Sequence, residues 1–309
     1  MKHLYDVPAP AKLNLFLHVT GRREDGYHLL QTVFVFIDLA DRLQFELRND
    51  GVICRQTSLP GIDHDSDLIV RAARALQKAT GTAKGATIQV QKNIPAGGGL
   101  GGGSSDAAST LIALNRLWQT GLSRWELQQL ALPLGADVPV FVFGQNTFAE
   151  GIGEAFTACR VPGHAYLVFQ PRLGIPTPAI FTDPDLCRNT PLVTVQDVQQ
   201  SLSLPISEAS SLSQPAFFGH NDLEAVACRQ HPGLQQLVDW LDVRQVKARM
   251  TGSGACFFAP FNSYEDALQV GHELEVALPA FNQGASVPVE RIIAARGLVR
   301  HPLHDWVKN

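Results

Sequence analysis

The chain has 309 residues, of which 45% are hydrophobic and 17% are charged, and its mean hydropathy is close to zero. These values are typical of a soluble globular protein and exclude a disordered chain. At roughly 150 residues per domain, the length predicts about two domains. The formal net charge of −4 excludes an overall positive field that would hold nucleic acid or an anionic membrane, so an anionic ligand needs a local binding device.

The cysteines and the N-terminus bear on the cellular compartment. Five cysteines, an odd number, lie far apart and form no C-x-x-C pair, which argues against a disulfide framework and against a zinc site. The first 12 residues lack the apolar core of a signal peptide, and no apolar run approaches the roughly 18 residues of a membrane span. We therefore expect a cytoplasmic protein with reduced thiols and with neither nucleic acid nor membrane as a partner.

Strand patterns come first along the chain. Residues 11–19 alternate between an apolar face and a second face that carries Lys12 and Asn14, which predicts a half-buried strand. Two further strand-like runs, 33–39 and 43–48, are separated by a few residues that include an aspartate. We expect these two runs to form an antiparallel hairpin.

The next elements are helices with one strand between them. Serine and aspartate before an apolar periodic run are typical of helix starts, and glycine is typical of helix ends. The expected elements are a helix over 67–79 capped by Asp65 or Ser66, a strand over 86–91, a helix over 104–118 that Gly121 ends, and a helix opened by a capping box from Ser123 to Glu126.

The second half mixes strands and helices in an order that favours an α+β unit of the ferredoxin-like kind. The expected elements are a strand over 166–170, an irregular Pro- and Ser-rich stretch over 171–215, helices over 222–230 and 233–241, strands on both sides of 251–255, a helix over 264–276 and a final strand over 288–294. We place the domain boundary between 155 and 165, which divides the chain into 1–160 and 161–309.

A glycine-rich segment directly before the 104–118 helix is the strongest single feature. Glycines allow consecutive backbone N–H groups to converge, and the helix N-terminus adds partial positive charge, so the segment can hold a phosphate without basic side chains. A tight strand-to-helix connection is the alternative, but six glycines exceed what a turn requires. The candidate phosphate-binding residues are Pro95, Ala96, Gly97, Gly98, Gly99, Leu100, Gly101, Gly102, Gly103, Ser104 and Ser105.

Other phosphate-binding folds lack their remaining signatures. Gly97, Gly99 and Gly102 satisfy G-x-G-x-x-G, but a second helix follows where a dinucleotide-binding fold needs a strand and an acidic residue. The chain has no G-x-x-x-x-G-K-[ST], H-R-D or D-F-G motif, so neither a P-loop enzyme nor a protein kinase is supported.

Two charged residues complete the parts that phosphoryl transfer needs. Asp137 can be the N-cap of a short helix, and Lys12 can be a solvated charge or half of a structural ion pair. Beside a phosphate cradle, however, an aspartate can accept a hydroxyl proton and a lysine can stabilise the charge of the transferring group. Both interpretations stay open at this point.

Two loops carry donors and rings that suit a ligand. Tyr27 and His28 place an aromatic ring beside an imidazole, a pair that can stack on and hydrogen-bond a nucleobase, although the composition is also that of an ordinary loop. Residues 251–255, TGSGA, form a flexible segment with hydroxyl and N–H donors, for which a hairpin turn is the alternative.

Three segments in chain order resemble the three motifs of the GHMP superfamily of small-molecule kinases, named for galactokinase, homoserine kinase, mevalonate kinase and phosphomevalonate kinase. They are PAPAKLNLFLHVTGRREDGYH, PAGGGLGGGSSDAA and MTGSGA, and they span almost the whole chain. AKLNLFL with DGYH, LGADVPVFV and IPTPAIFTDP are similar, more narrowly, to the family of 4-diphosphocytidyl-2-C-methyl-D-erythritol kinases.

The resemblance implies an ATP-dependent, Mg²⁺-assisted kinase with two α+β domains and an active-site cleft between them. The implied reaction transfers the γ-phosphoryl group of ATP to the 2-hydroxyl of 4-diphosphocytidyl-2-C-methyl-D-erythritol, in the methylerythritol phosphate route to isoprenoids. Residues 1–160 would be the ATP-binding domain, and 161–309 the C-terminal domain. Metal ligands stay open, with Ser104 or Ser105 as candidates, and the chain is expected to be a monomer or a homodimer.

The resemblance also implies roles for individual residues. Asp137 is the implied general base and Lys12 its electrostatic partner. Asn14, on the same strand face as Lys12 and about 6 to 7 Å along it, is placed to orient the substrate. The implied substrate-binding residues are Asn14, Tyr27, His28, Phe181 and Thr251, of which Tyr27, His28 and Phe181 match the positions that hold the cytosine.

Three alternatives remain. Another GHMP kinase acting on mevalonate, homoserine or a sugar would share the fold and the glycine segment, but its substrate has no base to stack. A nucleotide-binding module without catalysis would bind ATP only, and a nicotinamide oxidoreductase rests on the nominal G-x-G-x-x-G alone.

Overall fold

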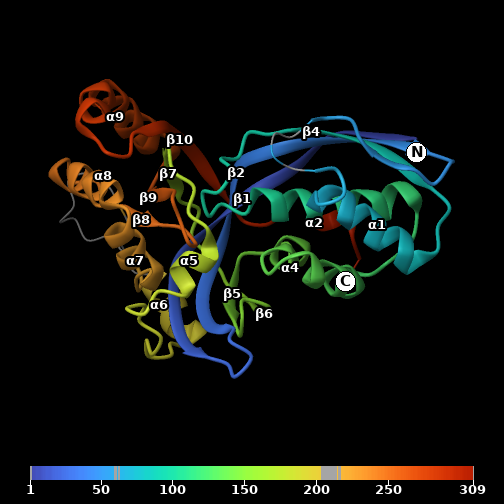
Figure 1. The fold of residues 1–309 in the computed structure, drawn as a ribbon, viewed down its shortest axis with the longest axis horizontal. Coiled ribbons are helices and arrows are strands. Elements are labelled where there is room, and N and C mark those ends of the chain that lie inside the picture. Colours follow the sequence, from blue (N-terminus) through green and yellow to red (C-terminus); the bar gives the residue numbers. More distant parts are fainter. Residues whose placement is uncertain (1, 59–60, 62, 203–213, 215–216, 309) are drawn as a thin grey trace.

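The fold is built on one mixed sheet that extends across most of the molecule (Figure 1). A computed structural model describes residues 2–58, 61, 63–202, 214 and 217–308. The strands in these ranges are β1 (His3–Arg22), β2 (His28–Arg48), β3 (Ile53–Arg55), β4 (Gly85–Gln91), β5 (Thr147–Glu150), β6 (Ala155–Ala158), β7 (Ala165–Pro171), β8 (Arg249–Met250), β9 (Phe257–Phe261) and β10 (Val289–Leu298). Their order is β3-β4-β2-β10-β7-β9-β8, with β1 and β5 also paired to β2, and β6 to β5.

Helices cover the two ends of this sheet. In Figure 1, α1 and α2 lie together along β1, β2 and β4, whereas α7, α8 and α9 lie beyond β7 to β10. The helices are α1 (Leu68–Thr80), α2 (Gly102–Trp118), α3 (Arg124–Ala131), η1 (Leu132–Leu134), α4 (Val138–Phe143), α5 (Thr177–Phe181), α6 (Val195–Leu202), α7 (Asp222–Gln230), α8 (Pro232–Val243), α9 (Tyr264–Gly284) and η2 (His304–Trp306). The mixture of helices and strands confirms the predicted α+β class.

The predicted hairpin between 33–39 and 43–48 is wrong. Both runs belong to the single strand β2, which pairs antiparallel with β1 along its whole length. The residues that separate the two runs, 40–42, pair in register with Pro8, Ala9 and Pro10, and the nearest shift falls on residues 38 and 39, so the strand continues without a turn. The carboxylate of Asp41, which suggested a turn, is buried and accepts hydrogen bonds from the backbone N–H groups that follow β4.

The first helices begin and end close to their predicted boundaries, with two corrections. The N-cap of α1 is Asp67, whose carboxylate accepts a backbone N–H of the first turn, and not Asp65 or Ser66. α2 ends at Gln119, which adopts the left-handed conformation two residues before Gly121. The capping box at the start of α3 is confirmed.

The second half contains two helices that the sequence patterns did not predict. The stretch 171–215 holds α5 and α6, while its residues 203–213 and 215 lie outside the described ranges. α5 follows Pro176 and is one turn and a half long, too short for apolar periodicity to reveal it. The other predicted strands and helices are present, and β7, α7 with α8, β8, β9, α9 and β10 follow one another in the ferredoxin-like order.

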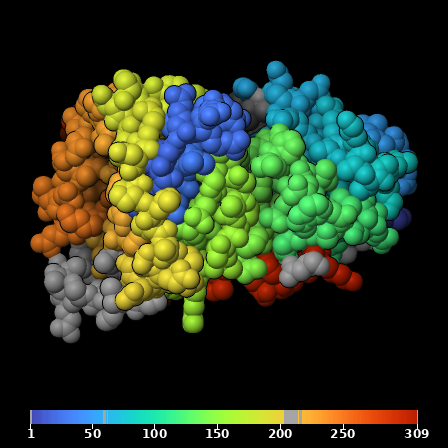
Figure 2. All heavy atoms as spheres, turned by 90° about the horizontal axis from the view of Figure 1, so that it is seen from below, coloured from blue at the N-terminus to red at the C-terminus, as the bar shows by residue number. Residues whose placement is uncertain are grey.

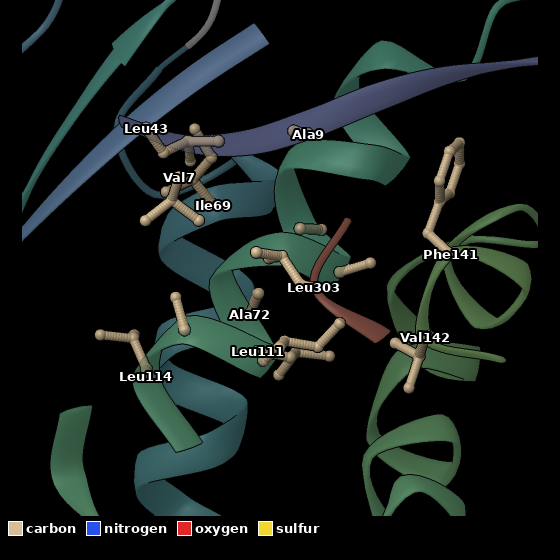
Figure 3. Packing of buried hydrophobic residues seen from close by; sticks show 14 of the residues in the cluster. Val7, Ala9, Leu43, Ile69, Ala72, Leu111, Leu114, Phe141, Val142 and Leu303 are labelled. Atoms are coloured by element: carbon tan, nitrogen blue, oxygen red, sulfur yellow. The ribbon is translucent and has the colours of Figure 1, made fainter. Parts of the chain in front are cut away.

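The C-terminal tail packs against the first half of the chain. Leu303 and Val307 belong to the same buried cluster as the apolar faces of α1, α2 and α4. Figure 3 shows Leu303 close to Ala72 of α1 and Leu111 of α2. Chain segments from both ends of the sequence therefore form one hydrophobic core beneath β1 and β2.

Candidate active site

A cleft of about 710 Å³ brings together residues from most of the predicted motifs. Its walls come from β1, β2, the loop between them, the glycine-rich segment, the start of α4, α5 and the 251–255 turn. Figure 2 shows the β1–β2 loop, in blue, beside the yellow segment that contains α5 and the green segment near β5. Segments that are distant in sequence thus share one cavity.

Lys12 and Asp137 meet inside this cleft. Lys12 Nζ lies 3.4 Å from Asp137 Oδ2 and donates a hydrogen bond of 2.6 Å to Asn14 Oδ1. The Lys12 side chain is 3% exposed and lies 5.4 Å from the centre of the Phe34 ring, whereas the Asp137 side chain is 38% exposed. A buried ammonium thus fixes a carboxylate that a ligand can still reach.

The local fold explains how Asp137 becomes available. It occupies the N-cap position of α4, but its side chain makes no capping hydrogen bond. Pro139 is in the first turn, where a missing N–H costs nothing because the first N–H groups of a helix have no partner within it. The carboxylate is therefore directed to Lys12 and not to the helix backbone.

Asn14 is held from two further sides. Its backbone N–H donates to Thr251 Oγ1 at 3.0 Å, and its side-chain amide donates to Thr32 Oγ1 at 2.9 Å. Thr251, predicted to bind the substrate, is fully buried and does not line the cleft; it lies behind Asn14. Its hydroxyl positions the strand that carries Lys12.

The glycine-rich segment forms one wall, but only part of it faces the cavity. Gly97, Gly99, Gly101 and Ser104 line the cleft. The predicted residues that do not line it are Pro95, Ala96, Gly98, Leu100, Gly102, Gly103 and Ser105.

Several of the residues behind this wall hold it in place. The Leu100 carbonyl accepts the backbone N–H of Lys12, and the Gly98 carbonyl accepts the backbone N–H of Cys256. The Ser105 hydroxyl donates to the Pro10 carbonyl. The segment is thus joined to β1 and to the 251–255 turn.

The predicted base-binding residues lie together at another part of the cleft. The rings of His28 and Phe181 are 4.9 Å apart, and Tyr27 is 61% exposed. All three line the same cavity as Lys12 and Asp137. Because the His28 and Phe181 rings contact each other, a flat heterocycle could stack on an outer face of the pair and not between the two rings.

The sequence patterns missed other polar residues of the site. Arg188 donates from Nε to His28 Nε2 at 3.1 Å, and the hydroxyl groups of Thr177 and Ser253, both in the cleft wall, lie 2.7 Å apart. Arg188 has no local motif, because its partner is 160 residues away in the chain. The IPTP segment was the available signal for Thr177.

A metal ion has no dedicated cage in the described part of the chain. No group of three or more His, Cys, Asp or Glu side chains there could hold one. Mg²⁺ in kinases is bound by one or two carboxylates together with substrate phosphates and waters. The Asp137 carboxylate and the Ser104 hydroxyl line the cleft and fit such a partial shell, whereas the Ser105 hydroxyl is buried against β1.

None of the described helices is both long and apolar enough to cross a bilayer.

Two family models match the chain: "GHMP kinases N terminal domain" over residues 67–145 and "GHMP kinases C terminal" over 206–279.

Curated relatives and solved structures agree with these matches. A 4-diphosphocytidyl-2-C-methyl-D-erythritol kinase of Bordetella bronchiseptica is 56% identical over 98% of this chain and 99% of its own length. A crystal structure of 4-(cytidine 5'-diphospho)-2C-methyl-D-erythritol kinase is 32% identical, with a TM-score of 0.74 over 96% of this chain and 98% of that one. A homoserine kinase from Cytophaga hutchinsonii, 15% identical, shares the fold with a TM-score of 0.67 over 97% and 95% of the two chains. The chain therefore belongs to the GHMP kinases and, among them, to the family of 4-diphosphocytidyl-2-C-methyl-D-erythritol kinases.

Proposed function

We propose that the protein phosphorylates the 2-hydroxyl of 4-diphosphocytidyl-2-C-methyl-D-erythritol with ATP, giving the 2-phosphate and ADP in the methylerythritol phosphate route to isoprenoids. The single observation that carries the proposal is that Lys12 and Asp137 share one cleft with the glycine-rich segment and the His28–Phe181 ring pair. The chain is 56% and 32% identical, over nearly its whole length, to two kinases named for this substrate, which favours it over mevalonate, homoserine or a sugar.

The two ends of the cleft fit the two substrates. The glycine-rich segment would bind the ATP phosphates through backbone N–H groups, at the start of α2 where the helix dipole favours negative charge. Tyr27, His28 and Phe181 would hold the cytosine, with stacking on the rings and a hydrogen bond from the imidazole. The diphosphate and erythritol parts would then lie between these ends.

The transfer step needs a proton acceptor and a positive charge at the reacting atoms. Asp137 would accept the proton of the 2-hydroxyl as its oxygen attacks the γ-phosphorus. Lys12, whose ammonium lies 3.4 Å from the Asp137 carboxylate, would stabilise the charge on the transferring group. Asn14, bonded to Lys12 and held by Thr251, would orient the erythritol chain.

Mg²⁺ would be held by Ser104 or Asp137 together with the ATP phosphates. When bound, it would neutralise charge on the phosphate oxygens. The proton acceptor and the ammonium come from the chain itself.

Three further expectations belong to this proposal. Free thiols at all five cysteines support a cytoplasmic location. A monomer and a homodimer remain the two expected states. The division into an ATP-binding domain at 1–160 and a C-terminal domain at 161–309 stays a prediction, and it is compatible with separate family models for the two halves.

The proposal is tested by measuring ADP release at saturating Mg²⁺ while ATP and the acceptor, 4-diphosphocytidyl-2-C-methyl-D-erythritol, are varied in turn, with and without CMP as a competitor. We expect ADP to match the acceptor consumed, and CMP to raise the KM for the acceptor without changing that for ATP. ADP release that ignores the acceptor, or a rate that CMP does not affect, would contradict the proposal.

A further inference from the structure

Arg188 lies beside the base-binding end of the cleft and is bonded on several sides. Its Nη2 donates to the carbonyl oxygens of Phe181, at 3.0 Å, and Asp183, at 2.6 Å, and its Nη1 donates to the Leu186 carbonyl at 3.0 Å. Its Nε donates to His28 Nε2 at 3.1 Å. One guanidinium therefore connects the segment after α5 to the imidazole on the other wall.

The hydrogen bond to His28 has a chemical consequence. A guanidinium has N–H donors and no acceptor, so His28 Nε2 must accept and cannot carry a proton. In a neutral imidazole the proton then resides on Nδ1. The ring edge left for a ligand is consequently an N–H donor.

The surroundings of His28 also oppose its protonation. Partial burial is the largest cause that lowers the pKa of His28, followed by the positive charges of Arg188 and Arg22. Asp25 and Asp137 are the carboxylates that line the same cleft. His28 therefore stays neutral at neutral pH, which is the state in which its tautomer matters.

Supporting contacts hold Arg188 in this position. The Asp183 carboxylate accepts hydrogen bonds from Arg229, at 2.5 Å, and from Gln230, at 2.7 Å, both at the end of α7. The carbonyl that receives Arg188 is thus fixed to a helix of the C-terminal half. A guanidinium held by three carbonyl oxygens has little freedom to turn away from His28.

We propose that Arg188 is a positioning residue that fixes His28 as the Nδ1–H tautomer and thereby makes the base site select cytosine over uracil. The inference rests on the proposed function for the identity of the base. Cytosine offers an unprotonated N3 that accepts from Nδ1–H, whereas N3 of uracil carries its own proton. With uracil in the site, the N3–H of the base would face the Nδ1–H of His28. Both groups are hydrogen-bond donors, so each would be left without an acceptor.

The tautomer is tested first in the free, full-length protein. Proton–nitrogen correlation spectra of the ¹⁵N-histidine-labelled protein distinguish a protonated from an unprotonated ring nitrogen, and the His28→Gln spectrum identifies the His28 signals. We expect Nε2 unprotonated and Nδ1 protonated. The opposite tautomer, or a mixture of both in the wild type, overturns the inference whatever the enzyme phosphorylates.

Variants of Arg188 then separate the tautomer from general support of the loop. Arg188→Met removes the N–H donors at similar length, and we expect a mixture of tautomers. Arg188→Lys retains a donor without an acceptor and is expected to restore the wild-type tautomer. Arg22→Gln is the matched control, because it removes a nearby charge that makes no hydrogen bond to His28, and it should leave the tautomer unchanged.

Selectivity is measured as kcat/KM for the cytidyl substrate divided by kcat/KM for its uridyl analogue. We expect the wild type and Arg188→Lys to prefer the cytidyl substrate at least about 10- to 100-fold, and Arg188→Met to lose most of that ratio. A ratio that Arg188→Met leaves unchanged overturns the inference. Absence of phosphorylation of either compound contradicts the proposed function instead, and the spectra alone then decide the tautomer.

Discussion

Lys12 and Asp137 each had two interpretations at the level of the single residue. Asp137 occupies an N-cap position yet makes no capping hydrogen bond, and the Lys12 ammonium is buried where a solvated charge would be exposed. Burying a charge is costly unless a partner compensates it. The cost is offset by Asp137 and Asn14, and the partner carboxylate stays accessible from the cleft.

Asp137→Asn is expected to lower kcat by about 10²–10⁴-fold, the usual contribution of a general base. The amide keeps the size of the side chain but cannot take a proton. ATP binding in the absence of Mg²⁺ should change little, because Asp137 is not part of the glycine-rich segment. Steady-state kinetics and titration with a non-hydrolysable ATP analogue measure the two effects.

The matched control for this variant is Asp239→Asn on the exposed side of α8, which should keep wild-type turnover. Turnover within a factor of a few of the wild type in Asp137→Asn would remove Asp137 from the proposed chemistry.

Lys92 is a partly exposed charge that pairs with two buried carboxylates from distant parts of the sequence. Its ammonium contacts the carboxylates of Asp41 and Asp106, whose side chains are 0% and 3% exposed. Burial raises the pKa of the Asp106 carboxyl. Because Asp41 also accepts N–H groups at the end of β4, this cluster supports the entry to the glycine-rich segment.

We expect Lys92→Met to lower the free energy of unfolding by about 3–5 kcal/mol, because it leaves the buried Asp41–Asp106 pair without its counter-charge. Urea denaturation at pH 7 measures the change. Lys247→Met, which removes an exposed ion pair with Asp242, should change it little. Equal effects of both substitutions would show that the buried cluster has no special role.

At the scale of the element, Gly99 is a position of the glycine-rich segment that only glycine fits. Gly99 has φ of +75°, and a Cβ there would lie 2.1 Å from the Thr251 carbonyl oxygen. Gly103, in the first turn of α2, would place its Cβ at an ordinary 3.6 Å from Leu68. The same substitution thus has different consequences within one segment.

Gly99→Ala should destabilise the protein by at least about 1–2 kcal/mol through the left-handed backbone alone, and it should raise the KM for ATP by displacing the cleft wall. Gly103→Ala is the control and should leave both values close to wild type. Urea denaturation and initial rates test the pair. An ATP KM that is equal in the two variants would contradict the close contact between the segment and the 251–255 turn.

Local signals were sufficient for many elements. The capping box at 123–126 and the apolar periodicity of α1 act over a few residues, and the structure follows them. The alternation over 11–19 predicted the strand correctly but its half-burial wrongly, because β1 is buried on both faces over these residues. The continuity of β2 through Asp41 could not be predicted in the same way. The Asp41 carboxylate contacts Lys92 and the backbone N–H of Asn93, and these contacts exist only after distant segments have packed.

At the scale of the whole molecule, the tail after Arg296 had no predicted role and proves to be part of the core. The backbone N–H of His301 donates to the Gly144 carbonyl, and the Arg124 side chain donates to the carbonyls of His304 and Val307. The tail therefore secures the end of α4, the helix that starts beside Asp137. No local pattern reveals this, because the partners come from opposite ends of the sequence.

The buried His301 makes stability depend on pH. Burial, followed by the charges of Arg124 and His304, lowers the pKa of His301 from its usual 6.5 to about 3. Between these values the unfolded chain binds a proton that the folded protein excludes, so stability is complete above 6.5 and declines toward pH 3. The decline contributed by this residue is at most about 1.4 kcal/mol per pH unit.

His301→Gln should therefore reduce the slope of unfolding free energy against pH between 6.5 and 4, even if it lowers the stability at pH 7.5. Urea denaturation across this range measures the slope, and His272→Gln, at an exposed position of α9, should keep it. An unchanged slope in His301→Gln would contradict the exclusion of the proton by the folded tail.

The chemical parts of the site were predictable to a similar extent as the fold. Lys12, Asp137, the glycine-rich segment and the base-binding rings carry recognisable local patterns, and the cleft contains members of each. Arg188 and the Thr177–Ser253 contact were missed, since each depends on a partner that only the assembled cleft supplies.

The most direct test of the central claim is transfer of label from γ-labelled ATP with Mg²⁺ in a mixture of 4-diphosphocytidyl-2-C-methyl-D-erythritol, mevalonate, homoserine and galactose. The account predicts label on the cytidyl compound alone, at its 2-hydroxyl, and about 10²–10⁴-fold slower transfer with Asp137→Asn. Label on another acceptor, or on none of the four, would contradict it.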